Sequence, residues 1–368
     1  MPQPITDVDA SCGGLTSTEA MQRPIKAGSN VRSRCMSSTA VALLMLSACA
    51  SNEKGTDLPE IEASLNGGET NSHAVAVPGT GMLKIHLLQR GVDARLEVRS
   101  PAGEPLAIHE SGTGPFGEEI AVVTVPRATT IVVLIRPAYP TAASAGYRLR
   151  FRLERTAPQA AIDYSTASRQ DPNLGMDERI ALYEASAQRD SGQPREEGLA
   201  LLAAASLLNV RGSQPERVQA LAAQAANNFR SAQEPMLLAQ SLLVGASAQL
   251  DLPKLDDRIR HDIVATLDEA QRLFSRQDAR ASIGEVAIYR GLMAFLDADR
   301  ETAFRHWTDA AERCASPFDA VCRAKALQNL ALLHNDSADY RQALASFDEA
   351  LRLITEADDP WLYSNINL

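Results

Sequence analysis

The feature that most constrains this fold is a set of small and large residues in the C-terminal half that recurs every 40 positions. The recurring positions are Gly291, Ala303, Trp307 and Ala310, followed by Ala331, Ala343, Phe347 and Ala350. An earlier copy of the last three positions is Ile263, Leu267 and Ala270, again 40 residues away. Such a period predicts pairs of helices that cannot bury their apolar faces alone and therefore stack into an array.

The segment from Leu327 to Leu351 strongly resembles a tetratricopeptide repeat, although His334 stands where that family usually has tyrosine. In the family, the small residue lets the second helix approach closely, and the large ring fills the space between pairs. The earlier pairs, at about 196–230 and 236–274, are assigned on periodicity alone, and generic α-hairpins are the alternative for them. We expect the array to span 176–368, with its last repeat incomplete.

The same resemblance implies a concave face lined by the first helix of each pair. A mixed apolar and polar face of this kind suits an extended peptide or a partner helix. For each residue singly, plain surface is the alternative. The residues expected to project into the groove are Glu285, Ile288, Leu292, Phe295, Lys325, Gln328, Leu332 and Asn335.

A different pattern, with apolar residues at every second position, runs through 58–155 and predicts a β-sandwich. Its clearest strand is 147–153, in which arginines alternate with apolar residues. The order of Leu96-Glu97-Val98, the turn at 100–103 and the closing Gly146-Tyr147 resembles the bacterial pre-peptidase C-terminal-type sandwich. That resemblance implies an accessory or binding domain of the cell envelope, joined to the helices by a linker at 156–175.

Residues 112–117 within this region fit the dinucleotide-binding pattern G-x-G-x-x-G. That chemistry needs the glycines to lead from a strand into a helix whose N-terminal amides meet the pyrophosphate. Here the residues after Gly117 continue as a strand, and two carboxylates stand where the phosphate would lie. We therefore expect a flexible hairpin loop and no nucleotide.

The N-terminal region reads as an export signal. Residues 1–35 lack periodicity and are expected to be disordered or a mis-annotated start. The apolar run within 36–49 is too short to span a membrane and ends at Leu46-Ser47-Ala48-Cys49, which resembles the bacterial lipobox. A buried or interfacial helix with a stray cysteine is the alternative. The resemblance implies lipidation of Cys49, a tether at 50–57, and a location on the periplasmic side of a membrane, with Ala50-Ser51 pointing to the outer membrane.

Charge and motif content narrow the function. The net charge is −10, and 157–368 holds 21 Lys/Arg against 31 Asp/Glu, which argues against nucleic acid as a partner. No spacing typical of a zinc site or a serine nucleophile occurs, so we expect no catalysis, metal or cofactor. Cys314 and Cys322 are the only cysteines after Cys49; they are expected either to form a disulfide or to stay as two reduced core thiols.

The order of lipobox, β-sandwich and helical repeats resembles the front of bacterial CHAT-domain proteins, whose C-terminal part is a caspase-like protease. Residues 361–368 resemble the start of another first helix, so we expect either a continuation beyond Leu368 or docking of this helix on a partner. Two hypotheses follow: a lipid-anchored scaffold that binds a protein through its groove, or the sensor and scaffold half of a CHAT-type protease.

Overall fold

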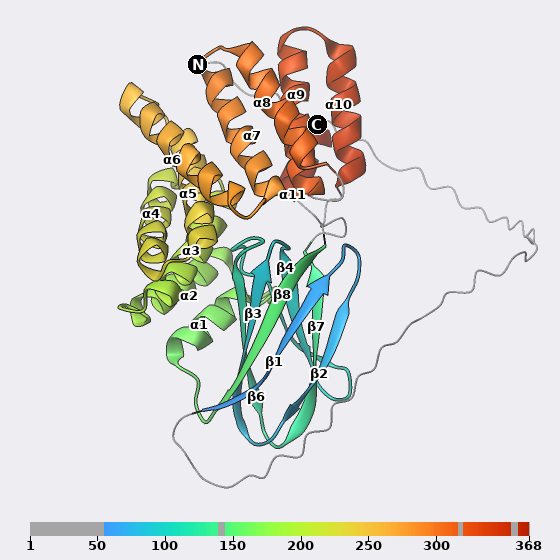
Figure 1. Cartoon of the computed structure of the whole chain (residues 1–368), viewed down its shortest axis with the longest axis vertical. Coiled ribbons are helices and arrows are strands. Elements are labelled where there is room, and N and C mark those ends of the chain that lie inside the picture. Colours follow the sequence, from blue (N-terminus) through green and yellow to red (C-terminus); the bar gives the residue numbers. More distant parts are fainter. Residues whose placement is uncertain (1–54, 139–143, 316–318, 355–359, 368) are drawn as a thin grey trace, which may run out of the picture. The chain divides into compact units, whose positions relative to one another are not determined.

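The computed structural model describes residues 55–138, 144–315, 319–354 and 360–367, which belong to one compact unit that begins at Asn52 (Figure 1). The expected signal at 36–49 and the expected lipidation site Cys49 lie outside the described residues.

The N-terminal part of the described chain is a β-sandwich of two four-stranded antiparallel sheets. The first has the order β1 (Thr56–Leu65), β8 (Ala145–Glu154), β3 (Gly81–Arg90), β6 (Glu118–Val125), and the second β2 (Asn71–Val77), β7 (Thr129–Pro137), β4 (Ala94–Arg99), β5 (Pro105–His109). Alternate residues of β3, Leu83, Ile85 and Leu87, are fully buried, as period two requires. The predicted β region, followed by helices, is confirmed.

Two predicted boundaries were wrong. Strand β1 begins at Thr56, inside the expected tether, and Thr56 pairs with Leu153 of β8. Its first residues are polar because β1 is an edge strand with exposed side chains, so polarity did not separate strand from tether. The expected linker 156–175 contains helix α1 (Gln159–Ser168), which begins directly after Pro158 and buries Tyr164 against Tyr183. Proline starts this helix rather than interrupting it.

The helical part continues with antiparallel helix pairs. After α1 come α2 (Met176–Arg189), α3 (Pro194–Val210), α4 (Pro215–Ala232), α5 (Pro235–Leu250), α6 (Asp257–Ser275), α7 (Arg280–Leu296), α8 (Arg300–Arg313), α9 (Ala320–Asp336), α10 (Tyr340–Leu353) and α11 (Pro360–Asn367). Each helix contacts the next, and α3, α5, α7 and α9 also contact one another in that order. First helices therefore line one side of a helical-repeat array.

The turns within the last two pairs repeat in detail. Ala298 and Ala338 both adopt a left-handed conformation, with φ near 60°. The next residue in each turn, Asp299 or Asp339, caps the second helix by accepting a hydrogen bond from a backbone N–H. These caps satisfy helix N-terminal donors and fix where α8 and α10 begin.

Small residues at two fixed positions explain how the first helices pack. The fifth residues of α3, α5, α7 and α9 are Gly198, Ala239, Gly284 and Ala324, and the twelfth are Ala205, Ala246, Gly291 and Ala331. A Cβ on Gly291 would overlap the Trp307 indole, whose Nε1 donates to the Ile288 carbonyl at 3.0 Å. The earlier pairs also have small residues at these positions. Their spacings, 41 residues from Gly198 to Ala239 and 45 from Ala239 to Gly284, differ from 40, so a search for a fixed 40-residue period does not find them.

Candidate binding face

The eight residues predicted to line the groove do not form one exposed stripe. Leu332 and Asn335 of α9 are exposed, Leu332 by 48%, and Gln328 beside them is partly exposed. Glu285 and Lys325 are also partly exposed and lie against the β-sandwich loops described below.

The assignment of Ile288 to the groove was wrong, because it is only 8% exposed and packs among residues of α8 and α9. Leu292 and Phe295 are partly buried against core clusters, and the Phe295 ring lies 5.7 Å from that of Trp307. These three residues, predicted to line the groove from α7, therefore pack against the neighbouring helices, and they do not face an open groove.

The β-sandwich covers the other end of the first-helix face. The loop at 112–117 joins β5 to β6, which lie in different sheets, so it is not the expected hairpin. Gly114 lies against the Gln240 side chain of α5, and the Phe116 ring lies 6.4 Å from Phe274 of α6. Thr113 is fully buried. The loop is thus packed rather than flexible, and it leads directly into strand β6.

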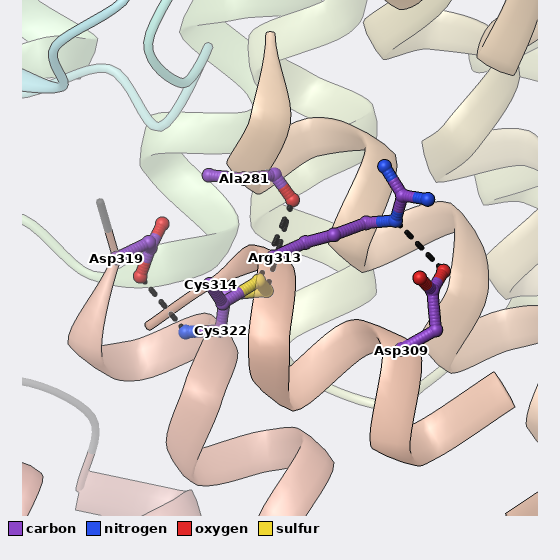
Figure 2. The surroundings of a disulfide bond; sticks show 6 residues. All are labelled: Ala281, Asp309, Arg313, Cys314, Asp319 and Cys322. Atoms are coloured by element: carbon purple, nitrogen blue, oxygen red, sulfur yellow. Dashed lines mark hydrogen bonds and ion pairs between the residues drawn. A yellow bond between two sulfur atoms is a disulfide. The ribbon is translucent and has the colours of Figure 1, made fainter. Parts of the chain in front are cut away.

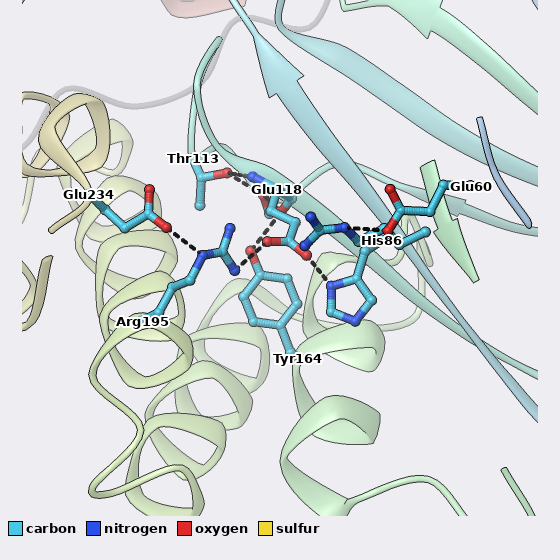
Figure 3. Close-up of polar contacts among 9 residues, drawn as sticks. Glu60, His86, Thr113, Glu118, Tyr164, Arg195 and Glu234 are labelled. Atoms are coloured by element: carbon cyan, nitrogen blue, oxygen red, sulfur yellow. Dashed lines mark hydrogen bonds and ion pairs between the residues drawn. The ribbon is translucent and has the colours of Figure 1, made fainter. Parts of the chain in front are cut away.

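A buried carboxylate fixes this contact, as Figure 3 shows. Glu118, at the start of β6, is 1% exposed and forms ion pairs with His86 of β3 and, at 2.7 Å, with Arg195 of α3. Arg195 also reaches Glu234 at 2.9 Å, and the Tyr164 hydroxyl donates to the Glu118 carbonyl at 3.0 Å. We call Glu118, His86, Arg195 and Glu234 the ion-pair cluster.

Burial favours the neutral form of Glu118, but its partners decide the outcome. The charges and hydrogen bonds of His86 and Arg195 outweigh the effect of burial and lower the pKa of Glu118 to about 2. The carboxylate is therefore ionised at neutral pH. It joins two strands of the sandwich to the first turn of α3.

A disulfide joins consecutive helix pairs (Figure 2). Cys314 follows α8, Cys322 lies in the first turn of α9, and both are buried with their sulfurs bonded. The sulfurs lie 3.6 and 3.7 Å from the Ala281 carbonyl oxygen of α7. Gly284 leaves the space for them, because a Cβ there would overlap the Cys314 sulfur. Asp319 caps α9 by accepting from the Cys322 N–H at 2.8 Å.

A pocket of about 410 Å³ lies between the sandwich loops and the helices. Its lining includes Asp93 from the β3–β4 loop, Glu285 of α7 and Asp319 before α9. Burial, with Glu110 and Asp319 nearby, raises the pKa of Asp93 to about 7. Burial also raises the pKa of Glu285 to about 7, against the opposing effect of Lys325, and raises that of Asp319. Sequence reasoning missed Asp93, because only the fold brings this loop to the helices.

Within the described ranges, no group of three or more His, Cys, Asp or Glu side chains is arranged to hold a metal ion. No helix in the same ranges has the length and apolarity needed to cross a membrane.

No protein-family model and no curated protein matches this sequence. Among solved structures, a Rap protein complexed with Competence and Sporulation Factor is 14% identical, with a TM-score of 0.49, over 57% of this chain and 58% of that protein. The present chain thus matches just over half of that protein's length. BtubC from P. vanneervenii is 16% identical, with a TM-score of 0.40, over 48% of this chain and 72% of that one.

Proposed function

We propose that this chain is a non-catalytic scaffold that binds a protein partner through the first-helix face of α7 and α9. The observation that carries the proposal is the exposed Leu332, flanked by the amides of Gln328 and Asn335 at the end that the sandwich loop does not cover. An apolar side chain between hydrogen-bonding groups suits an extended peptide or a partner helix.

The proposal includes attachment to the envelope. The Leu46-Ser47-Ala48-Cys49 motif supports lipidation of Cys49 and a location on the periplasmic side of a membrane, with the outer membrane expected. A Cys49→Ser variant in the native host should lose incorporation of labelled fatty acid and leave the membrane fraction. Unchanged labelling would remove the anchor from the proposal and leave the binding face standing.

The test of the binding face is site-specific photo-crosslinking in the native host. A photoreactive phenylalanine analogue at Leu332 should yield a defined crosslinked protein. The same analogue at Val264 of α6 is the matched control, since Val264 is 47% exposed and lies on a second helix. Leu332→Asp should abolish capture measured by a probe at Asn335, and Val264→Asp should not. An identical set of products from both probe sites would contradict the proposal.

The order of sandwich and helical array favours one alternative, the regulatory half of a CHAT-type protease. Sequencing the source gene through its 3′ end tests it, because a protease domain with paired His and Cys must then follow in frame. A stop codon directly after Leu368 would leave the scaffold.

A further inference from the structure

The pocket between the sandwich loops and the helices brings three carboxylates and an aromatic ring into one lining, together with Arg90, Arg280 and Lys325. Asp93, Glu285 and Asp319 line it from three separate segments, and Phe116 also lines it. Carboxylates attract a positive charge through direct pairing, and an aromatic face attracts it through the ring quadrupole. Asp93 and Phe116 come from loops of the sandwich, whereas Glu285 and Asp319 come from the helical part.

The pocket also contains acceptors that the protein leaves unused. Asp93 Oδ1 and Gln240 Oε1 are buried and receive no hydrogen bond from the part of the chain that the structure describes. A buried acceptor without a donor costs free energy, so a ligand that brings N–H groups to this lining gains by satisfying them. Ammonium and guanidinium groups carry donors only.

The lining also holds three cations, Arg90, Arg280 and Lys325, and Lys325 lowers the pKa of Glu285 and of Asp319 against the larger effect of burial. Arg90 pairs with Glu62 of β1 at 3.6 Å, and Arg280 and Lys325 make interactions of their own. The carboxylates meanwhile repel one another: Asp319 disfavours the charged forms of both Asp93 and Glu285. A metal ion is a poor fit, since the described residues hold no group arranged as its ligands.

We propose that this pocket binds one ammonium or guanidinium group, presented by a lysine or arginine side chain of the partner that lies along the first-helix face. The statement that a partner protein presents this group rests on the proposed function. The preference for an organic cation rests on the residues that line the pocket. The volume, about 410 Å³, is in the range of small-ligand pockets and accommodates one long side chain.

The test compares two probes of nearly equal shape, N-acetyl-arginine amide and N-acetyl-citrulline amide, by calorimetric titration of the full chain at pH 8. The arginine probe should bind at least about tenfold more tightly, because only it carries the charge. Asp93→Asn and Glu285→Gln should each weaken its binding about tenfold while leaving the citrulline probe unchanged. Glu301→Gln, an exposed carboxylate on α8, is the control and should have no effect.

Equal affinity for the two probes, no binding of the arginine probe, or equal losses in Glu301→Gln would each overturn the inference. Thermal unfolding of every variant checks folding, and two separate variants guard against the failure of one. Crosslinking at Leu332 tells this outcome apart from failure of the proposed function. A defined crosslink without probe binding removes only the cation site, whereas probe binding without a crosslink removes only the partner-binding face.

Discussion

The β-sandwich meets the helical array at two polar places whose carboxylates have opposite pKa shifts. In the ion-pair cluster, Glu118 has His86 and Arg195 within reach, and its pKa falls to about 2. At the pocket, Asp93 and Glu285 face other carboxylates, and burial raises the pKa of each to about 7. Both places combine sandwich loops or strands with first helices.

The difference separates a structural contact from a candidate binding site. A buried charge that the chain itself pairs with a histidine and an arginine has little left to offer a ligand. A partly buried carboxylate without a sufficient cation lowers the stability of the free protein, and such arrangements are typical of functional sites. The comparison predicts opposite signs for mutations at the two places.

The largest effect is expected for Glu118→Ala. Removing this carboxylate leaves Arg195 and His86 without their buried partner, so the free energy of unfolding should fall by about 3–5 kcal/mol. Urea unfolding followed by circular dichroism measures it. Glu62→Ala, which removes an exposed partner of Arg148, is the control and should cost at most about 1 kcal/mol. Equal losses of unfolding free energy in Glu118→Ala and Glu62→Ala would contradict the prediction that the buried ion pairs contribute more to stability than the exposed pair.

Asp93→Asn should have the opposite sign and stabilise the protein by about 2 kcal/mol at pH 8. The shift in pKa from 3.8 to about 7 sets an upper limit of ~4 kcal/mol, which relaxation and water reduce. Because the folded pKa is raised, the wild type loses stability as pH rises from about 4 to about 7, and the variant's advantage should vanish near pH 4. A variant that is less stable than the wild type at pH 8 would contradict the proposed strain.

The smallest effect is expected for Arg195→Lys. The guanidinium reaches Glu118 and Glu234 at 2.7 and 2.9 Å through different nitrogens, and one ammonium cannot copy that geometry. We expect a loss of about 1 kcal/mol in urea unfolding. Arg230→Lys, in the exposed pair with Glu269, is the control and should change little. A loss as large as that of Glu118→Ala would mean that the simultaneous contact of Arg195 with Glu118 and Glu234 dominates the stability of the cluster.

Sequence patterns predicted the elements better than their contacts. The alternation around 147–153 and the 40-residue period identified strands and helices because each reports one face of one element. Helix α1 was missed because ten largely small and polar residues after Pro158 resemble a linker. The burial of its Tyr164 depends on neighbouring elements that the local sequence does not show. The regular spacing of the last two pairs depends on equal turn lengths, which the earlier pairs do not share.

The site was less predictable for a physical reason. The repeat pattern places Glu285 and Lys325 on a first-helix face but does not say what lies opposite them. Asp93 and Phe116 belong to loops of the β-sandwich, and no period in the sequence links them to α7. Ile288 was misplaced because an ideal helical stripe ignores the lateral contact with α8 and α9.

The disulfide has a mechanical consequence. In a stack of helix pairs, each pair contacts only its neighbours, so a force that pulls the two ends apart acts on every interface between pairs. We call each such interface a joint, and its resistance to separation depends on the contacts that cross it. Cys314 and Cys322 place a covalent bond across the joint between the pairs α7–α8 and α9–α10. When the array is pulled from its ends, that joint does not separate, and extension is confined to the joints on either side. The segment that carries Leu332 therefore keeps its position relative to α7 under load.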